Sequence, residues 1–585
     1  MLKRYTQLIA LILSVTISAQ FKTIQKTDGN GYKYEVVEND PSNARIYTLD
    51  NGLKIYLAQN KDEPRIQTYI PVRTGSNNDP EDNTGLAHYL EHMLFKGTSK
   101  IGSYDWETEK VYLQKISDLY EAHKAEPNAD KKAAIYRQID SISNIAANYA
   151  VANEYDKLIS SLGASGTNAH TWFDETVYKN NIPANELEKW MYIESERFSE
   201  LVLRLFHTEL EAVYEEFNRA QDNDFRLIHY ALMKNLFPTS RYGTQTTIGT
   251  SEHLKNPSFL ALHEYFDEYY VPNNYAIVLV GDFEFDETVQ MIDKYFGHFK
   301  KGPEPSRYVA QEPALKSIKE VEVFSPSAER LQFAYRVGGA KTQDAKYLRV
   351  MDMLLSNSLA GLLDLNINQK QLMQYAGSYP QIMKDYSAHI FNAIPKSGQT
   401  LEEARDLILE QIEKIKKGEF DEWMLEAVIN DMKKSEQRSL ENMNALATKM
   451  YDSFILEQSW AEIVSDLDEL SKITKSDIVK FANENYKDNY VIVYKRQGEN
   501  KDLVRVENPG ITPVNLNREN ESQFYKDFQN FEVKEIEPVF VDFNQSIKRE
   551  KLKSTDFSFI ENTINDLSSV YYITDMGSDH NKKLS

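Results

Sequence analysis

The 585-residue chain contains no cysteine. It therefore has no disulfide framework, thiol nucleophile or iron–sulfur cluster, and any metal site must be built from His, Asp and Glu. Basic residues are also scarce, because 67 Lys and Arg stand against 89 Asp and Glu and leave a formal charge of −22. Binding to nucleic acid or to anionic lipid needs an excess of Lys and Arg. We therefore exclude a nucleic-acid partner.

Long apolar runs are missing as well. Residues 1–19 read MLKRYTQLIALILSVTISA, in which Lys3 and Arg4 precede a short apolar run that ends at the small residues Ser18 and Ala19. This order is typical of a secretory signal peptide, and the run is too short to span a bilayer. No later stretch approaches the length of a membrane span, and no cysteine is available for a lipid anchor. We predict an exported protein, periplasmic or secreted, without a membrane anchor.

The first part of the chain alternates strand and helix signals. Residues 45–58 predict a hairpin around Asn51-Gly52, which is a strong turn dipeptide. Thr84 is expected to cap a helix that runs through LAHYLEHMLF, where apolar residues recur at helical spacing. The polar, helix-favouring stretch 104–153 has a single proline break and predicts a helical hairpin.

The chain then partly repeats itself. FDEYYVPNNYAIVLV at 266–280 aligns without gaps with FANENYKDNYVIVYK at 481–495, and in both a helix end leads through Asn-Tyr into an apolar strand. The surrounding order of strands and helices matches too. We predict an α+β fold of two homologous modules, 40–300 and 315–497, each with a mainly antiparallel sheet covered by helices.

A third module is expected to begin near the end of the chain. IPVRTGSN at 70–77 resembles YITDMGSD at 572–579. A natural domain should not stop between a strand and the helix that covers it, because the apolar face of the sheet would be left in water. We therefore predict a linker over 498–565 and the beginning of a third module over 566–585. On this interpretation the chain is the N-terminal part of a longer protein.

The residues that indicate chemistry are HYLEH. His88 and His92 lie one helical turn apart on one face, with Glu91 beside them. Two imidazoles at this spacing can bind one zinc ion while the carboxylate stays close to the metal's water. Zinc lowers the pKa of that water, and a carboxylate can then take its proton for attack on a carbonyl.

Zinc needs a third ligand, which the helix-favouring sequence TELEAVYEEFNRA can supply. Glu209 and Glu216 are two turns apart and share one helical face, and spacing alone does not choose between them. Glu211 and Glu215 point elsewhere and fit a solvated acidic face. His207, just before the predicted helix, is a weaker candidate.

A family resemblance adds to this pattern. GLAHYLEHMLFKGT at 85–98 resembles the signature of the pitrilysin/insulinase zinc peptidases, with their inverted His-x-x-Glu-His order. The resemblance continues through NGLKIYL, TGSNNDP, GASGTNAHTWFDETVYKNNIP and VPNNYAIVLVGD. It covers 45–300 closely and 315–497 more loosely. The second module has no His-x-x-Glu-His and is expected to be non-catalytic.

The resemblance implies a role for each candidate residue. The implied roles are His88, His92 and Glu216 as ligands of one zinc ion per chain, Glu91 as the general base, Glu209 as a supporting carboxylate, and Asn168 and Ala169 on a strand edge that pairs with an extended peptide. In the family, two similar halves close around a chamber. The implied partners are peptide substrates and a C-terminal half of the same protein or a partner subunit.

Two functions are compatible with these residues. The first is a zinc-dependent endopeptidase that hydrolyses peptides or small unfolded polypeptides, with Glu91 activating a zinc-bound water. The alternative is a non-catalytic peptide-binding or partner subunit that uses the same clamshell. The separation of His92 from Glu216 exceeds the family pattern, and the helical stretch 104–153 accounts for the excess. An insertion at this point can lengthen the wall of the site without breaking it, because it falls between the two helices that carry the candidate ligands.

Overall fold

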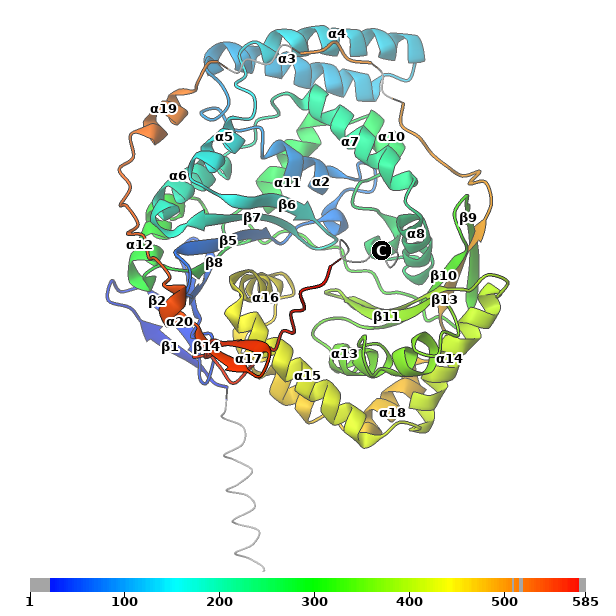
Figure 1. The fold of residues 1–585 in the computed structure, drawn as a ribbon. Helices are drawn as coiled ribbons and strands as arrows, with labels where there is room; N and C mark the ends of the chain where they lie inside the picture. The colour runs from blue at the N-terminus through cyan, green and yellow to red at the C-terminus, as the bar shows by residue number, and fades with distance from the viewer. Residues whose placement is uncertain (1–20, 508–509, 515–518, 578–585) are drawn as a thin grey trace, which may run out of the picture.

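The computed structural model describes residues 21–507, 510–514 and 519–577, and its chain forms two large sheets with helices around them (Figure 1). The predicted signal peptide, residues 1–19, lies outside the described residues. No helix among the described residues is long and apolar enough to cross a membrane.

The first module contains a sheet of eight strands in the order β1-β2-β3-β4-β8-β5-β7-β6. Neighbouring strands in this sheet run antiparallel, except for β4 and β8, which run parallel. The strands are β1 Thr23–Thr27, β2 Lys33–Val37, β3 Arg45–Thr48, β4 Lys54–Gln59, β5 Arg65–Val72, β6 Ser165–Thr171, β7 Thr176–Pro183 and β8 Ala276–Gly281. The predicted hairpin is the β3–β4 pair, and Gly52 at its turn has a positive φ of 88°, which a residue with a side chain rarely adopts.

The second module repeats this strand order in a sheet of five. Its strands are β9 Lys319–Ser325, β10 Arg330–Gly338, β11 Tyr375–Ile382, β12 Tyr386–Ile394 and β13 Val491–Gln497. The order β9-β13-β10-β12-β11 corresponds strand for strand to β4-β8-β5-β7-β6. In the first sheet β8 lies between β4 and β5, and in the second β13 lies between β9 and β10; each is parallel to the first strand of its pair and antiparallel to the second. The predicted α+β class with two related, mainly antiparallel modules is confirmed.

Helices cover both sheets. The longer ones are α2 Leu86–Met93, α3 Trp106–Ala125, α4 Ala129–Ala147, α5 Glu154–Ser161, α6 Leu187–Arg197, α7 Phe206–Gln221, α8 Asp224–Leu236, α11 Phe259–Tyr269, α12 Phe285–Phe296, α13 Gln343–Leu355, α14 Leu401–Lys417, α15 Glu422–Glu441, α16 Met443–Ile455, α17 Trp460–Ser471 and α18 Lys475–Asn485. The repeated segments lie where the sequence predicts them, because α11 leads into β8 and α18 leads into β13.

One helix of each module packs against the sheet of the other module (Figure 1). Helix α8 of the first module buries Leu232 and Leu236 against Val491 and Val493 of β13. Helix α16 of the second module packs on the first sheet, where residues including Met450 are buried with strands β4, β5 and β8. A fully buried side chain of this kind contributes about 1.5–3 kcal/mol. Separating the modules would expose both surfaces.

The predicted helical hairpin is present as α3 and α4, which break at Glu126–Asn128. A buried ion pair fixes its first turn, because Nε of Arg204 lies 2.7 Å from a carboxylate oxygen of Glu109 and both side chains are 1% exposed. Tyr120 packs inside the first module against Phe206 and Phe259. Apart from such contacts, the hairpin lies at the periphery of the first module (Figure 1). Among the described residues, those that line the cavity beside His88 and His92 include none from α3 or α4.

The region after the second module differs from the sequence interpretation. The predicted linker 498–565 contains helix α19, Gln523–Gln529, whose Phe524 stacks on Tyr192 of α6 with ring centroids 4.3 Å apart. Its aromatic residues attach this segment to the first module. The same region contains the short helix α20 Phe543–Ser546 and the hairpin strands β14 Lys548–Leu552 and β15 Thr555–Phe559. Residues 566–577 form no strand, and the rest of the predicted third module lies outside the described residues.

The cap of helix α2 also differs from the prediction. Gly85, with φ at 90°, precedes the helix in place of Thr84, whose hydroxyl lies 2.7 Å from Nδ1 of His253. The capping acceptor is Asp79, whose carboxylate accepts hydrogen bonds from the backbone N–H of Gly85 at 2.7 Å and of Ala87 at 3.0 Å. Asp79 is fully buried and satisfies two of the unpaired N–H groups at this helix start. It was missed because it lies outside the usual capping position.

We predict that Asp79→Ala lowers the free energy of unfolding by about 1–2 kcal/mol, because two buried N–H groups lose their acceptor. Urea unfolding followed by circular dichroism measures the change. Asp82→Ala is the matched control, since Asp82 is exposed in the same loop. Equal losses in the two variants would contradict the capping role.

The same carboxylate predicts a pH dependence. Burial raises the pKa of Asp79 from 3.8 to about 7, against the opposing effect of its backbone hydrogen bonds. Between these pH values the folded state holds a proton that the unfolded state has released, so stability falls as pH rises through this window. The free energy of unfolding of the wild type, relative to Asp79→Asn, is expected to decrease from pH 4 to pH 7 and then level off. A constant difference would show that Asp79 does not titrate there.

Candidate metal centre

Helices α2 and α7 bring three possible metal ligands together. His88 and His92 project from one face of α2, and their Nε2 atoms are 3.3 Å apart. Oε2 of Glu216, from α7, lies 3.5 Å from Nε2 of His88 and 3.7 Å from Nε2 of His92. The two helices are joined by the hydroxyl of Tyr89, which donates to the carbonyl of Phe206 at 3.1 Å. These three side chains form a cluster with ligand atoms close enough to hold one metal ion.

The spacing of the three atoms fits zinc. Two ligand atoms about 2.0–2.1 Å from a zinc ion, at a tetrahedral angle, lie about 3.4 Å apart. The observed separations of 3.3, 3.5 and 3.7 Å fall close to that value. Burial and the neighbouring His92 lower the pKa of His88 to about 3, so its imidazole is neutral at pH 7 and can offer a lone pair.

A second carboxylate orients His92. Oε1 of Glu209 lies 2.7 Å from Nδ1 of His92, which directs the Nε2 atom of that ring toward the cluster. Lys96, four residues after His92 and past the end of α2, pairs with the other oxygen of Glu209 at 2.5 Å. Burial alone would lower the pKa of His92, but the hydrogen bond and the charge of Glu209 raise it. Conversely, His92 and Lys96 hold the pKa of Glu209 below its ordinary value in spite of burial.

Glu91 lies beside the cluster and is 9% exposed. Its Oε2 accepts a hydrogen bond of 2.6 Å from the hydroxyl of Thr171, the last residue of strand β6. Burial raises the pKa of the Glu91 carboxyl, although the Thr171 hydrogen bond and His92 oppose the shift. A carboxylate with a raised pKa, in a cavity and next to three possible metal ligands, is suited to general base catalysis.

These groups line a cavity of about 1090 Å³. Strand β6, at the edge of the first sheet, forms one side, and Asn168 and Ala169 both line the cavity. Asn168 is exposed, whereas Ala169 is buried. Residues Arg226 and Tyr230 of α8 also line it, as do residues 379–381 of β11 in the second module. In Figure 1 helix α2 lies between α7 and β6, and His88, His92 and Glu216 line the same cavity as residues of β6.

The structure distinguishes the glutamates that spacing left tied. Glu216 points into the cluster of imidazole Nε2 atoms, while Glu209 contacts the far nitrogen of His92. Glu215 is exposed, as predicted for a solvated residue. His207, the weaker candidate, is buried outside the cluster of possible ligands. Its Nδ1 lies 3.0 Å from the hydroxyl of Tyr120.

Two residues of the site were not found from the sequence. Lys96 follows His92 by four residues, just past the end of α2, and that proximity in the sequence could have indicated its contact with the same carboxylate. Thr171 lies far from Glu91 in the sequence, and only the pairing of β6 at the edge of the sheet brings the two side chains together. No local pattern indicates that contact.

Comparison with known proteins also indicates a relative of the zinc peptidases. Residues 54–111 match the insulinase family (peptidase family M16), and residues 258–432 match the M16 inactive domain. The chain is 22% identical to the zinc protease PqqE of Helicobacter pylori, over 75% of this chain and 90% of that protein. It is 22% identical to the uncharacterized zinc protease YmxG of Bacillus subtilis, over 76% and 96% respectively. These matches support a protein of the pitrilysin/insulinase family.

Solved structures show the same fold. A protease from Helicobacter pylori matches with a TM-score of 0.65 and 22% identity, over 77% of this chain and 99% of that chain. The first half of the periplasmic protease PqqL from Escherichia coli matches with a TM-score of 0.59 and 17% identity, over 78% and 92%. The complete PqqL is covered over 54% of its chain, with a TM-score of 0.60 and 16% identity.

Proposed function

We propose that this protein is a zinc-dependent endopeptidase that hydrolyses peptides or small unfolded polypeptides. The observation that supports this most strongly is the convergence of His88, His92 and Glu216 at separations close to those of tetrahedral zinc ligands, with Glu91 at their side. A zinc ion held there would lower the pKa of a water molecule and polarise the substrate carbonyl.

Glu91 is the general base in this proposal. Its carboxylate takes the proton from the attacking water and returns it to the leaving amine. Thr171 fixes the orientation of that carboxylate through its hydroxyl, at 2.6 Å. The buried position of Glu91 raises its pKa, which makes it a stronger base than an exposed carboxylate.

Strand β6 is the substrate-binding edge in this proposal. The N–H of Trp172 donates to the carbonyl of Glu175 across the hairpin. In an antiparallel ladder the direction of backbone groups alternates, so the backbone groups of Thr171 and Ala169 face the free edge. An extended peptide can add there as a further strand, with Asn168 beside it. Edge pairing uses backbone groups and so favours unfolded substrates.

We also propose a partner for the open side of the site. The E. coli protein PqqL has a first half that matches this chain and is itself covered over little more than half of its length. A C-terminal half of the same protein, or a partner subunit, would close the chamber over the metal cluster. Residues 1–19, with the layout of a signal peptide, support export to the periplasm or beyond.

We expect Glu91→Gln to retain zinc and to lose hydrolysis by about 10²–10⁴-fold, because the amide cannot accept the proton. The measurement is cleavage of a fluorogenic peptide mixture by the complete protein, together with its zinc content. Glu215→Gln is the matched control, since Glu215 is an exposed glutamate. Cleavage at the wild-type rate by Glu91→Gln would refute the mechanism. A wild type that holds zinc and binds peptides without cleaving them would favour the non-catalytic alternative.

The contact between Glu209 and His92 makes a separate prediction about metal affinity. Glu209→Ala removes the acceptor that orients His92 and leaves Lys96 without its partner, so zinc affinity is expected to fall about 10–100-fold. Competition with a chromophoric chelator measures the affinity without any assay of activity. Glu215→Ala should leave it unchanged. Equal zinc affinity in the two variants would show that Glu209 does not support the site.

A further inference from the structure

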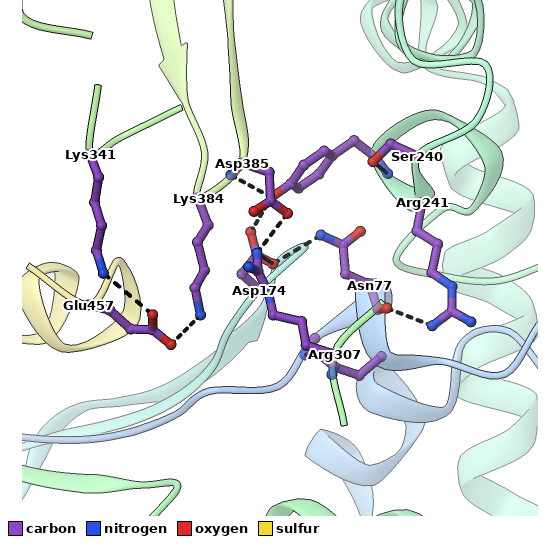
Figure 2. A network of polar contacts seen from close by, with 12 residues as sticks. Asn77, Asp174, Ser240, Arg241, Arg307, Lys341, Lys384, Asp385 and Glu457 are labelled. Carbon is purple, nitrogen blue, oxygen red and sulfur yellow. Dashed lines mark hydrogen bonds and ion pairs between the residues drawn. The ribbon is translucent and has the colours of Figure 1, made fainter. Parts of the chain in front are cut away.

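Two equivalent hairpins, one from each module, meet tip to tip beside the cavity. The first is β6–β7, and the second is β11–β12, its counterpart in the repeated strand order. Phe173 at the first tip and Met383 at the second are buried in the same cluster with Tyr242. The segment that joins the two modules passes this contact and places Arg307 between the tips (Figure 2).

Arg307 contacts one carboxylate from each hairpin. Its Nη2 lies 2.7 Å from Oδ2 of Asp385, in the β11–β12 turn, and 3.7 Å from Oδ1 of Asp174, in the β6–β7 turn. The Asp174 and Asp385 side chains are only 13% and 20% exposed. Figure 2 shows Asp174 and Asp385 facing one another across the guanidinium.

The two carboxylates depend on this cation. Burial raises the pKa of Asp385, the charge of Asp174 adds to the rise, and Arg307 opposes it. Lys384 adds a weaker opposing charge, but its ammonium is bonded to Glu457 at 2.5 Å. Without Arg307, two partly buried like charges would face each other at the contact between the modules, which is unfavourable.

The first turn is also bonded to the loop that leads into helix α2. Asn77 donates through its side-chain amide to Asp174 at 3.0 Å, and its backbone N–H donates to the carbonyl of Phe173 at 2.9 Å. The hydroxyl of Tyr242 donates to the other oxygen of Asp174 at 2.8 Å. A side chain at Gly75 would lie 2.2 Å from the carbonyl of Trp172, so the loop and the turn are in close contact. The turn is therefore held on both sides.

The residue that contacts Glu91 lies in the same hairpin. Thr171 precedes Asp174 by three residues and donates to the Glu91 carboxylate at 2.6 Å. The hairpin also carries the free edge of β6 along which a peptide would pair. A shift of the turn would move both the Thr171 hydroxyl and the binding edge relative to helix α2.

We propose that Arg307 is a positioning residue through which the second, non-catalytic module holds the β6–β7 hairpin in place beside Glu91. The second module thus acts on the site through the Asp385–Arg307–Asp174 contact, in addition to the surface that it contributes to the cavity. The structural part of this inference is independent of the reaction, and its kinetic part rests on the proposed peptidase function.

The structural part is tested by hydrogen exchange. Arg307→Ala is expected to speed amide exchange in residues 165–183 about tenfold or more, because opening of the hairpin contact becomes easier. Lys341→Ala is the matched control, since Lys341 contacts only Glu457 in the same network, at 3.5 Å, and is half exposed. The combination Arg307→Ala with Asp385→Asn should restore much of the protection, because the pair of like charges is removed. Unchanged exchange in Arg307→Ala, or a double variant no better protected than the single one, would overturn the proposal.

The kinetic part is tested in the complete protein with peptide substrates. Arg307→Ala should lower kcat about tenfold at unchanged zinc content, since the Thr171–Glu91 contact is loosened while the metal ligands stay in place. Arg307→Lys should recover part of the loss by restoring one positive charge. Loss of zinc in parallel with kcat would indicate general unfolding and overturn the positioning role. If Arg307→Ala exchanges faster than the wild type but the wild type cleaves no peptide, the proposed function is refuted and the coupling between the modules stands.

Discussion

The exchange of helices between the two modules is the constraint on which the rest of the structure depends. Helix α8 of the first module covers the second sheet, and α16 of the second module covers the first. Helices α7 and α8 are separated only by Asp222 and Asn223, so the seating of α8 on the second sheet also fixes the end of α7 that carries Glu216. The position of Glu216, a candidate metal ligand, thus depends on apolar burial in the neighbouring module. A non-catalytic module can be required for the site without containing any of its ligands.

The candidate metal centre brings together electron-rich groups whose proximity is unfavourable unless a cation lies between them. Two imidazoles and a carboxylate direct their electron-rich atoms at one point, and a second carboxylate orients one of the imidazoles. Lys96 balances the charge of Glu209. Glu91 remains outside this group, with its carboxylate held by Thr171 from the edge strand. The separation of ligand groups from a basic group of raised pKa is the arrangement expected of a hydrolytic metal site.

The sequence predicted the parts of the molecule that depend on local pattern. The Asn51-Gly52 turn, the one-turn spacing of His88 and His92, and the repeat of a helix end leading into an apolar strand each correspond to an observed element. Features set by distant contacts were not predictable. Glu209 and Glu216 share a helical face, so spacing left them tied and only the family resemblance implied which one is the ligand. In the structure the position of α2 across from α7 distinguishes them. The cap at Asp79, the Thr171 contact and the packing of α19 likewise depend on residues far apart in the chain or outside the usual motif.

The most direct test of the metal centre is X-ray diffraction at the zinc absorption edge from crystals of the protein grown with zinc. We predict one anomalous peak per chain, about 2.0–2.2 Å from Nε2 of His88, Nε2 of His92 and a carboxylate oxygen of Glu216, with Glu209 bonded only to His92 and Lys96. A peak bonded to Glu209 in place of Glu216, or no peak between the two histidines, would contradict the assignment.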